Sequence, residues 1–109
     1  MIVYLVRHAE AAAGGVDADR RLTAAGRTAF AGLLSSLGAR LGVKRVLTSP
    51  FLRARQTAEI LGRATGAGVE TLDDLASGHA GGRELLALLR LQADGTALVG
   101  HNPEVAEAL

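Results

Sequence analysis

The sequence opens with MIVYLVRHAE (residues 1–10), and its apolar run at 2–6 decides the expected fold. A short, continuous apolar run that contains Val and Ile is typical of a strand buried on both faces of a parallel sheet. Similar runs stand at 46–48 and 97–100, and 68–72 is predicted to be a further strand. Between these runs stand segments with the capping residues and the apolar spacing of helices. Strands that alternate with helices predict an α/β fold, with a mostly parallel sheet flanked by helices.

The predicted helices are recognised by their ends. Thr23, Ser49 and Asn102 are good capping residues, and the latter two are each followed by a proline, which suits the first position of a helix. Glycines at 38 and 66 are suitable stops. The expected helices span 23–38, 50–66, 84–92 and the residues from 102 onward. Four apolar side chains share one face of the first helix: Phe30, Leu33, Leu34 and Leu37.

Composition limits the class of protein. The chain has 109 residues, of which 49% are hydrophobic, with no Cys and a formal net charge of +1. These values describe one globular domain, 1–109, and exclude a disordered chain, a collagen-like chain and a disulfide scaffold. Because the charge is nearly balanced, we expect no nucleic-acid partner. No basic segment precedes the run at 2–6 and no apolar run is long enough to cross a bilayer, so we expect a cytoplasmic protein without a membrane partner.

Polar side chains follow three of the predicted strands. Arg7 and His8 come after the first strand, Ser49 follows the second with Arg53 one turn into the next helix, and His101 follows the last. Ligands bind beyond the carboxyl ends of the strands in open parallel sheets, so we expect these side chains to meet at one edge. Two guanidinium groups, two imidazoles and a helix N-terminus suit a phosphoryl group, whose oxygens accept forked hydrogen bonds.

Of these side chains, His8 is the expected nucleophile. A neutral imidazole can attack phosphorus, and a second imidazole can donate to an equatorial oxygen. The neighbouring cations are expected to lower the pKa of His8 and so keep its attacking nitrogen unprotonated near neutral pH. A metal site built from His8, Glu10, His79 and His101 is the rival interpretation, but the adjacent arginines would repel a divalent cation. Since dinucleotide and P-loop motifs are also missing from the sequence, we expect no metal and no cofactor.

Three segments carry a family resemblance: LVRHAE (5–10), TSPFLRARQTA (48–58) and VGHNP (99–103). In order and spacing they resemble the signature segments of the histidine phosphatase superfamily, which has the phosphoglycerate mutase-like fold. With the short length of the chain, DRRLTAAG (19–26) most resembles the small SixA-type phosphohistidine phosphatases. The resemblance covers nearly the whole chain and implies a histidine phosphatase domain.

The resemblance implies a role for each residue of the predicted site. His8 would be the phosphorylated nucleophile, Arg7 and Arg53 would bind the phosphoryl oxygens, and His101 would complete the pocket. Water would then hydrolyse the phosphohistidine intermediate. No metal is implied, because the arginines supply the positive charge that Mg²⁺ supplies in other phosphoryl-transfer enzymes.

The sequence departs from the family pattern at several places. Asp74 falls where relatives carry a Glu and is the first candidate for the general acid. The alternative acids are Glu84, Asp17 and Asp19. Ala9 stands where many relatives have Gly, and Asn102 stands where phytase-like members have Asp. SixA-type domains continue for some tens of residues past the second His motif, so the domain is expected to be incomplete at its C-terminal end, without the elements that close the sheet.

The expected function is that of a metal-independent phosphatase with a phosphohistidine intermediate, acting on protein phosphohistidine. The expected partner is a phosphorylated substrate, with a phosphohistidine-bearing signalling protein favoured. The alternatives are a phosphatase of small phosphomonoesters or nucleotides and a catalytically weak phosphate-binding module. Five other polar residues have structural interpretations: Ser49 and Asn102 as helix caps, Arg55 and Gln56 as a solvated helix face, and His79 as a solvent-exposed side chain.

Overall fold

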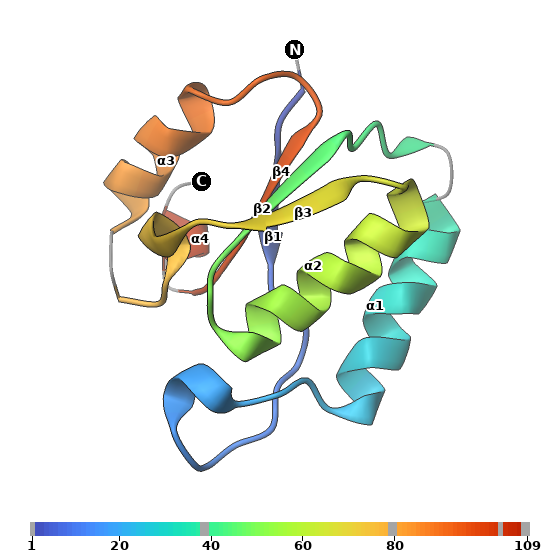
Figure 1. Ribbon diagram of the computed structural model, residues 1–109, viewed down its shortest axis with the longest axis vertical. Helices are drawn as coiled ribbons and strands as arrows, with labels where there is room; N and C mark the ends of the chain where they lie inside the picture. Colours follow the sequence, from blue (N-terminus) through green and yellow to red (C-terminus); the bar gives the residue numbers. More distant parts are fainter. Residues whose placement is uncertain (1, 38–39, 79–80, 103, 108–109) are drawn as a thin grey trace.

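The computed structural model describes residues 2–37, 40–78, 81–102 and 104–107. Within these ranges, a sheet of four parallel strands alternates along the chain with four α-helices (Figure 1). The strands are β1 (Tyr4–Arg7), β2 (Arg45–Thr48), β3 (Gly68–Thr71) and β4 (Thr96–Gly100). The helices are α1 (Ala24–Leu37), α2 (Leu52–Thr65), α3 (Gly82–Arg90) and α4 (Glu104–Glu107). The predicted α/β fold with a parallel sheet is confirmed.

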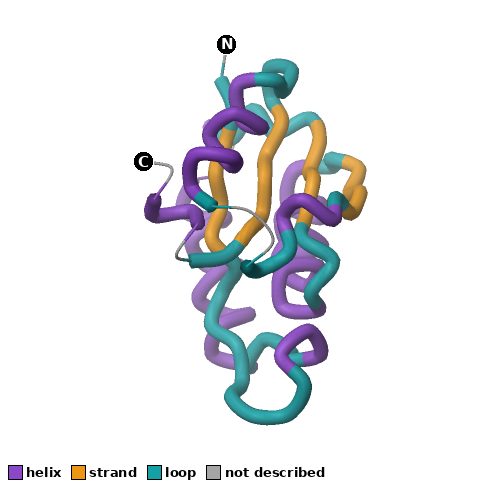
Figure 2. The backbone as a smooth tube through the Cα atoms, turned by 90° about the vertical axis from the view of Figure 1, so that its left-hand side faces the viewer, coloured by secondary structure: helices purple, strands orange, loops and turns teal. Residues whose placement is uncertain are grey.

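The sheet lies between two pairs of helices, α1 with α2 on one face and α3 with α4 on the other (Figures 1 and 2). Successive side chains of a strand point to opposite faces of the sheet. Val46 and Val99 therefore pack against α1 and α2, whereas Leu47 and Leu98 pack against α3 and α4. Burial on both faces explains why β2 and β4 have continuous apolar sequences.

The strand order, β1-β4-β2-β3, brings the carboxyl ends of three strands together. Arg7 pairs with Gly100 in the register between β1 and β4. The residues that follow these two strands, His8 and His101, therefore leave the sheet side by side. Ser49 follows β2, the other neighbour of β4. The topology thus gathers the predicted polar residues at one edge of the sheet.

β1 differs from the predicted strand. It begins at Tyr4 rather than Ile2, and its side chains are only half-buried, with Arg7 exposed. The reason is its place at the edge of the sheet. A groove of about 370 Å³ runs between β1 and α1, and Leu33 in its lining is 53% exposed. Phe30, Leu33, Leu34 and Leu37 all line this groove, so the predicted shared face of α1 is confirmed, with Leu34 buried and Leu33 exposed.

The helix ends follow the predicted chemistry in part. Thr23 caps α1 by accepting a hydrogen bond from the N–H three residues later (2.9 Å), and Gly66, at φ 76°, ends α2. However, α2 begins at Leu52 rather than at Pro50, and α3 begins and ends two residues before its predicted bounds. The predicted stop at Gly38 lies outside the described residues. In the described part of the chain, no helix is long and apolar enough to cross a membrane.

A long loop between β1 and α1 extends beyond the carboxyl edge of the sheet, at the lower end of the molecule in Figure 1. An antiparallel bridge between Ala11 and Leu22 closes its base, and it contains the short 3-10 helix η1 (Asp17–Asp19). The N–H of Leu22 donates to Oε1 of Gln56 on α2 (2.8 Å). The prediction of a solvated Gln56 is therefore wrong, because this side chain anchors the loop. Arg55 is exposed, as predicted.

Candidate active site

His8 is the first residue after β1, and hydrogen bonds fix the backbone on both of its sides. Its own N–H donates to the carbonyl oxygen of Gly100 (3.1 Å), which continues the ladder between β1 and β4. The next N–H, of Ala9, donates to Oγ1 of Thr57 (3.0 Å), a fully buried side chain of α2. The turn after β1 is thus tied to the sheet and to α2, and both ties restrict the position of the half-buried imidazole.

The two ring nitrogens of His8 have different surroundings. Nδ1 lies 2.7 Å from the carbonyl oxygen of Ala9. Because a carbonyl oxygen only accepts hydrogen bonds, Nδ1 carries the proton and Nε2 keeps its lone pair. Nε2 accepts a hydrogen bond from Nε of Arg53 (3.3 Å). The nitrogen with the lone pair is therefore the one that faces the guanidinium group.

Arg53, in the first turn of α2, is the buried cation of the site and is only 4% exposed. The centre of its guanidinium group lies 5.0 Å from the centroid of the Phe51 ring, a cation–π contact. The guanidinium group also donates to the carbonyl oxygen of Asp17 (2.6 Å) and to the Asp17 carboxylate (3.3 Å). A buried guanidinium group that already binds carboxylate oxygen is well placed to bind another anionic oxygen.

The loop before α1 contributes Asp17 and Arg20 to this edge of the sheet. Arg20 donates to Oδ1 of Asp17 (2.9 Å) and to the carbonyl oxygen of Ala12 (2.7 Å). Desolvation by its neighbours raises the pKa of the exposed Asp17 carboxyl group, but the hydrogen bonds and charges of Arg20 and Arg53 outweigh it and hold that pKa below its usual value. Asp17 is therefore a carboxylate near neutral pH, and it links the loop to the buried cation.

His101 follows β4 and is 2% exposed. Its ring centroid lies 5.1 Å from that of His8 and 5.1 Å from that of Phe51. Its Nε2 lies 2.7 Å from Oγ of Ser49. The interpretation of Ser49 as a cap is correct in part. Its Oγ accepts a hydrogen bond from the N–H of Phe51 (3.2 Å), just before α2 begins at Leu52, and the same hydroxyl group also contacts the second imidazole.

Both imidazoles are expected to be neutral at pH 7. Burial lowers the pKa of His8, and the carbonyl oxygen of Ala9 opposes this effect. Burial also lowers the pKa of His101 to about 4, and the charges of Arg53 and His8 act in the same direction. The cations that lower the pKa of His8 further are Arg53, Arg7 and Arg20. An attacking nitrogen on His8 therefore stays unprotonated to lower pH than in a free histidine.

The lowered pKa of His101 predicts a loss of stability in acid. His101 binds a proton near pH 6.5 in the unfolded chain but only near pH 4 in the folded protein. The neutral His101 ring therefore adds to the free energy of unfolding above pH 6.5, and this contribution is lost as the pH falls towards 4. Allowing for solvent screening, the loss is about 2 kcal/mol. Urea unfolding gives the free energy of unfolding of the wild type and of His101→Gln at each pH. The difference between the two proteins should shrink by this amount from pH 6.5 to pH 4. A difference that stays constant over this range would contradict the lowered pKa of His101.

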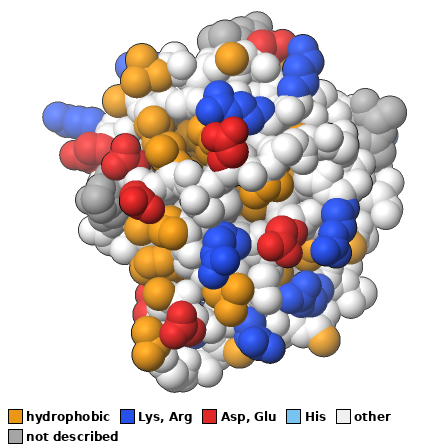
Figure 3. All heavy atoms as spheres, in the orientation of Figure 1, with side chains coloured by type: hydrophobic (Ala, Val, Ile, Leu, Met, Phe, Trp, Pro, Cys, Tyr) orange, Lys and Arg blue, Asp and Glu red, His pale blue; other side chains and the backbone are white. Residues whose placement is uncertain are grey.

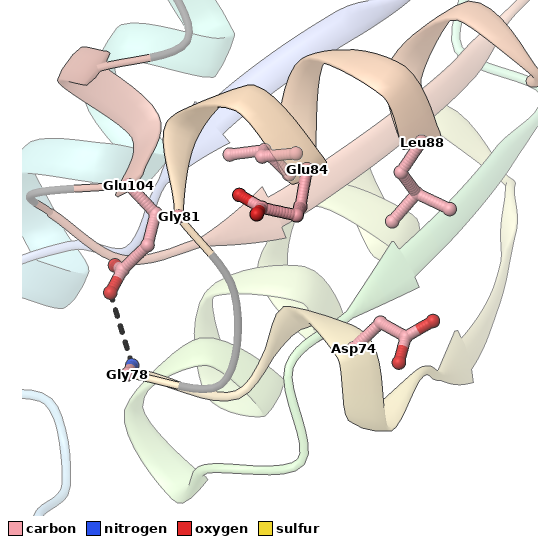
Figure 4. A pocket seen from close by; sticks show the side chains of 7 residues that line it. Asp74, Gly78, Gly81, Glu84, Leu88 and Glu104 are labelled. Carbon is pink, nitrogen blue, oxygen red and sulfur yellow. Dashed lines mark hydrogen bonds between the residues drawn. The ribbon is translucent and has the colours of Figure 1, made fainter.

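Four of the five predicted site residues lie together, and the fifth lies in a neighbouring cleft. The four are Arg7, His8, Arg53 and His101. Asp74 lies on the 3-10 helix η3 (Asp73–Leu75), and its side chain is exposed. It lines a cleft of about 610 Å³ together with Glu84 of α3 and Glu104 of α4 (Figure 4). Asp74 also lines a small cavity, of about 10 Å³, that reaches His101.

The cleft beside Asp74 is acidic. Glu84 extends into it from α3, and Glu104 accepts a hydrogen bond from the N–H of Gly78 (3.0 Å), as Figure 4 shows. Acidic and basic side chains are interspersed on the face seen in Figure 3, with acidic ones gathered on the side of α3. Within the described ranges, no group of three or more His, Asp or Glu side chains is arranged to hold a metal ion. His79 lies outside those ranges.

Sequence reasoning missed several residues that support the site. Ser49, Thr57 and Gln56 belong to the segment TSPFLRARQTA. Its sequence predicts Ser49 at this edge but not its contact with an imidazole, predicts a solvated Gln56, and assigns no role to Thr57. Their contacts with His101, Ala9 and the long loop depend on the tertiary fold. Arg20 was also missed, although it stands in the segment DRRLTAAG that carried part of the resemblance.

Comparison with known proteins agrees with this geometry. Residues 3–99 match the model of the histidine phosphatase superfamily (branch 1). An uncharacterized protein of Picosynechococcus sp. is 41% identical over 117 residues, covering 98% of this chain and 70% of that protein.

Two solved structures illustrate the likeness of fold. A structure described as the putative phosphohistidine phosphatase SixA from Agrobacterium tumefaciens is 32% identical, has a TM-score of 0.84, and is matched over 97% of this chain and 72% of its own. The protein histidine phosphatase SixA complexed with tungstate is 30% identical, with a TM-score of 0.73, over 94% of this chain and 70% of its own. With its family match, its parallel sheet and its pair of neighbouring histidines beside a buried arginine, the chain belongs to branch 1 of the histidine phosphatase superfamily and is a SixA-type phosphatase.

Proposed function

We propose that this phosphatase hydrolyses phosphohistidine on a protein substrate through a phosphorylated His8. The observation that carries the proposal is the pair of contacts at the His8 ring. The carbonyl oxygen of Ala9 holds the proton on Nδ1, and the unprotonated Nε2 accepts a hydrogen bond from the buried Arg53 guanidinium group. A nucleophile and an anion-binding cation thus lie on the same side of one imidazole.

The first step transfers the phosphoryl group to the enzyme. Nε2 of His8 uses its lone pair to attack phosphorus, and the bond between phosphorus and the leaving group breaks. The leaving group takes a proton from the general acid as it departs, and the water of the second step returns a proton to that acid. Arg53 and Arg7 bind the phosphoryl oxygens. Arg53 exchanges its contacts with Nε2 of His8 and with the Asp17 carboxylate for contacts with the phosphoryl group, which releases the lone pair for attack. His101 lies beside the acceptor ring and completes the oxyanion site.

The second step regenerates the enzyme. Water attacks the phosphorus of phospho-His8, the bond between phosphorus and Nε2 breaks, and inorganic phosphate leaves with the oxygen of that water. Nε2 recovers its lone pair, because the proton on Nδ1 is held by the Ala9 carbonyl throughout. The arginines stabilise the transferring group in both steps by charge and position, which supply most of the catalysis in phosphoryl transfer.

Protein phosphohistidine is the proposed substrate because of its leaving group. Imidazole departs far more readily than an alkoxide, so the reaction depends little on a strong general acid. In the free enzyme the pKa of Asp17 is lowered, so the carboxyl group closest to Arg53 starts as a carboxylate. The two similar SixA structures, one named a putative phosphohistidine phosphatase and the other a protein histidine phosphatase, support the same class. The enzyme should hydrolyse a histidine-phosphorylated protein faster than an aryl phosphate. If it binds inorganic phosphate but hydrolyses neither compound, the result would favour a phosphate-binding module instead.

The general acid can be identified by comparing leaving groups. Asp17 is in hydrogen-bond contact with Arg53, and a bound phosphoryl dianion would raise its pKa and let it carry the proton. We expect Asp17→Asn to reduce kcat for an alkyl phosphate about 100-fold, and kcat for phosphohistidine less than tenfold. Asp74→Asn should change both rates by less than threefold, about the size of a surface effect.

Two further variants make this comparison decisive. Asp19→Asn removes a neighbouring exposed carboxylate of η1 and serves as the control for loop charge. Glu84→Gln tests the remaining carboxylate named as an alternative acid. If Asp74→Asn shows the leaving-group dependence and Asp17→Asn does not, Asp74 is the acid and the assignment of Asp17 is wrong.

A further inference from the structure

The two nitrogens of His101 are unequally satisfied. Nε2 contacts Oγ of Ser49 (2.7 Å), but Nδ1 is buried and has no hydrogen-bond partner among the described residues. The side chain is 2% exposed, so bulk water does not reach this nitrogen. A buried polar atom without a partner costs free energy, and such atoms in native proteins usually bind an internal water or have a functional role.

Glu104 presents a second buried atom of the same kind. This residue is the first of α4, three positions after His101, and its Oε1 accepts a hydrogen bond from the N–H of Gly78 (3.0 Å). Its Oε2 is buried and has no partner among the described residues. One oxygen of the carboxylate therefore accepts a hydrogen bond from a backbone N–H, and the other is a buried acceptor without a donor among the described residues.

Both side chains line the same small cavity. It is bounded by Gly100, His101 and Glu104 on one side and by Asp74 and Leu85 on the other, and its volume is about 10 Å³. That volume is close to one water molecule, and a buried water needs two to four polar partners. An imidazole N–H donor and a carboxylate acceptor supply two such partners.

We propose that Glu104 is a positioning residue for His101, and that its carboxylate accepts the Nδ1 proton of His101 through one water held in this cavity. The role of His101 in binding the phosphoryl group is part of the proposed function, and this inference rests on it. A proton on Nδ1 leaves Nε2 as an acceptor for the hydroxyl group of Ser49 in the free enzyme. Carboxylates that receive the far N–H of an imidazole fix its tautomer and ring orientation in other active sites.

The charges around His101 explain what Glu104 adds during the reaction. Arg53 and His8 face the ring from α2 and β1 and disfavour its protonation, whereas Asp17 favours it from the loop. When a phosphoryl dianion binds, His101 can donate to it only with a proton on Nε2. A second proton, taken up from solvent with the anion, then makes the ring an imidazolium, and Glu104 is the carboxylate that lines the cavity beside it. The negative charge of Glu104 thus stabilises the positive charge of the His101 ring while the phosphoryl group is bound.

The test reads the His101 ring directly by nitrogen NMR, before any activity is measured. In the wild-type protein we expect Nδ1 to carry the proton, with a magnetisation transfer from that proton to a long-lived water. Glu104→Leu should move the proton towards Nε2 and reduce kcat about tenfold with KM little changed. Glu104→Gln keeps an acceptor oxygen and should retain the tautomer and most of kcat.

Glu107→Leu is the matched control. Glu107 lies on the same helix, and its Oε1 accepts a hydrogen bond from the N–H of Gly82 (3.2 Å), yet it does not line the cavity with His101. We expect this variant to leave the ring signals of His101 unchanged. A wild-type ring protonated on Nε2 alone, or ring signals that Glu104→Leu leaves unchanged, would overturn the proposal, and the first outcome needs no variant to fold. If the ring behaves as expected while no phosphohistidine is hydrolysed, the proposed function fails and the assignment of Glu104 stands.

Discussion

His8→Ala is expected to reduce turnover of phosphohistidine and of aryl phosphate by about 10⁴-fold or more, because it removes the nitrogen that forms the covalent intermediate. The residual rate would come from oriented binding at the arginines alone. The measurement is kcat for both substrates in the wild type and in the variant, at a pH above 6.5 where the wild-type ring is neutral.

The variant also separates loss of chemistry from loss of binding. His8→Ala leaves Arg53, Arg7 and Arg20 in place, so the protein should still bind vanadate or inorganic phosphate, with an affinity within about tenfold of the wild type. If hydrolysis persisted at the wild-type rate, His8 would not be the nucleophile. If anion binding disappeared together with hydrolysis, the loss of activity would reflect a disrupted site, and His8→Asn would then be the variant to measure.

Arg53→Ala is expected to reduce kcat/KM by about 10³-fold, since removing a single buried donor to a developing oxyanion costs 10²–10³-fold in other enzymes. Arg53 is 4% exposed and provides both the donor to Nε2 of His8 and the cation that meets the phosphoryl group. Arg55, two positions along the same helix, is exposed and donates to the carbonyl oxygen of Pro50. Arg55→Ala is therefore the matched control and should change kcat/KM by less than twofold, as surface substitutions usually do.

Two measurements accompany the Arg53 comparison. Thermal unfolding should show that Arg53→Ala remains folded, although the lost contacts with Asp17 lower its stability by about 1–3 kcal/mol. The affinity for inorganic phosphate should fall in Arg53→Ala and not in Arg55→Ala. Equal losses in the two variants would mean that general positive charge, and not the buried guanidinium group, binds the anion.

The parts of this site that could be predicted are those set by the sheet. Arg7, His8 and His101 stand directly after strands whose continuous apolar sequences are easy to recognise, and a parallel sheet places such residues at one edge. Arg53 follows β2 by one turn of helix, so its place depends on local geometry as well. A side chain that stands within a few residues of a strand end can occupy only a few positions relative to the sheet edge. For that reason the sequence predicts the place of these four residues.

The parts that could not be predicted depend on how a loop returns to the site. Asp17 and Arg20 lie on a long loop between β1 and α1, and the hydrogen bond from Leu22 to Gln56 fixes where that loop crosses α2. A hydrogen bond between a loop and a helix leaves no periodic pattern in the sequence. Ser49 has the chemistry of a helix cap and accepts a hydrogen bond from the N–H of Phe51, but only the position of His101 shows that its hydroxyl group also contacts an imidazole. The exposure of Leu33 likewise follows from the place of β1 at the sheet edge, which strand order alone determines.

The central claim is the covalent intermediate on His8, and trapping it is the most direct test. Wild-type protein is mixed with a phosphohistidine donor, stopped within milliseconds in alkali, where phosphohistidine is stable, and digested for peptide mass spectrometry. The account predicts one phosphoryl group on the peptide that contains His8, located on Nε2, labile in acid and missing in His8→Ala. Turnover at the full rate with no phosphorylated peptide at any quench time, or a phosphoryl group carried by His101 instead, would contradict it.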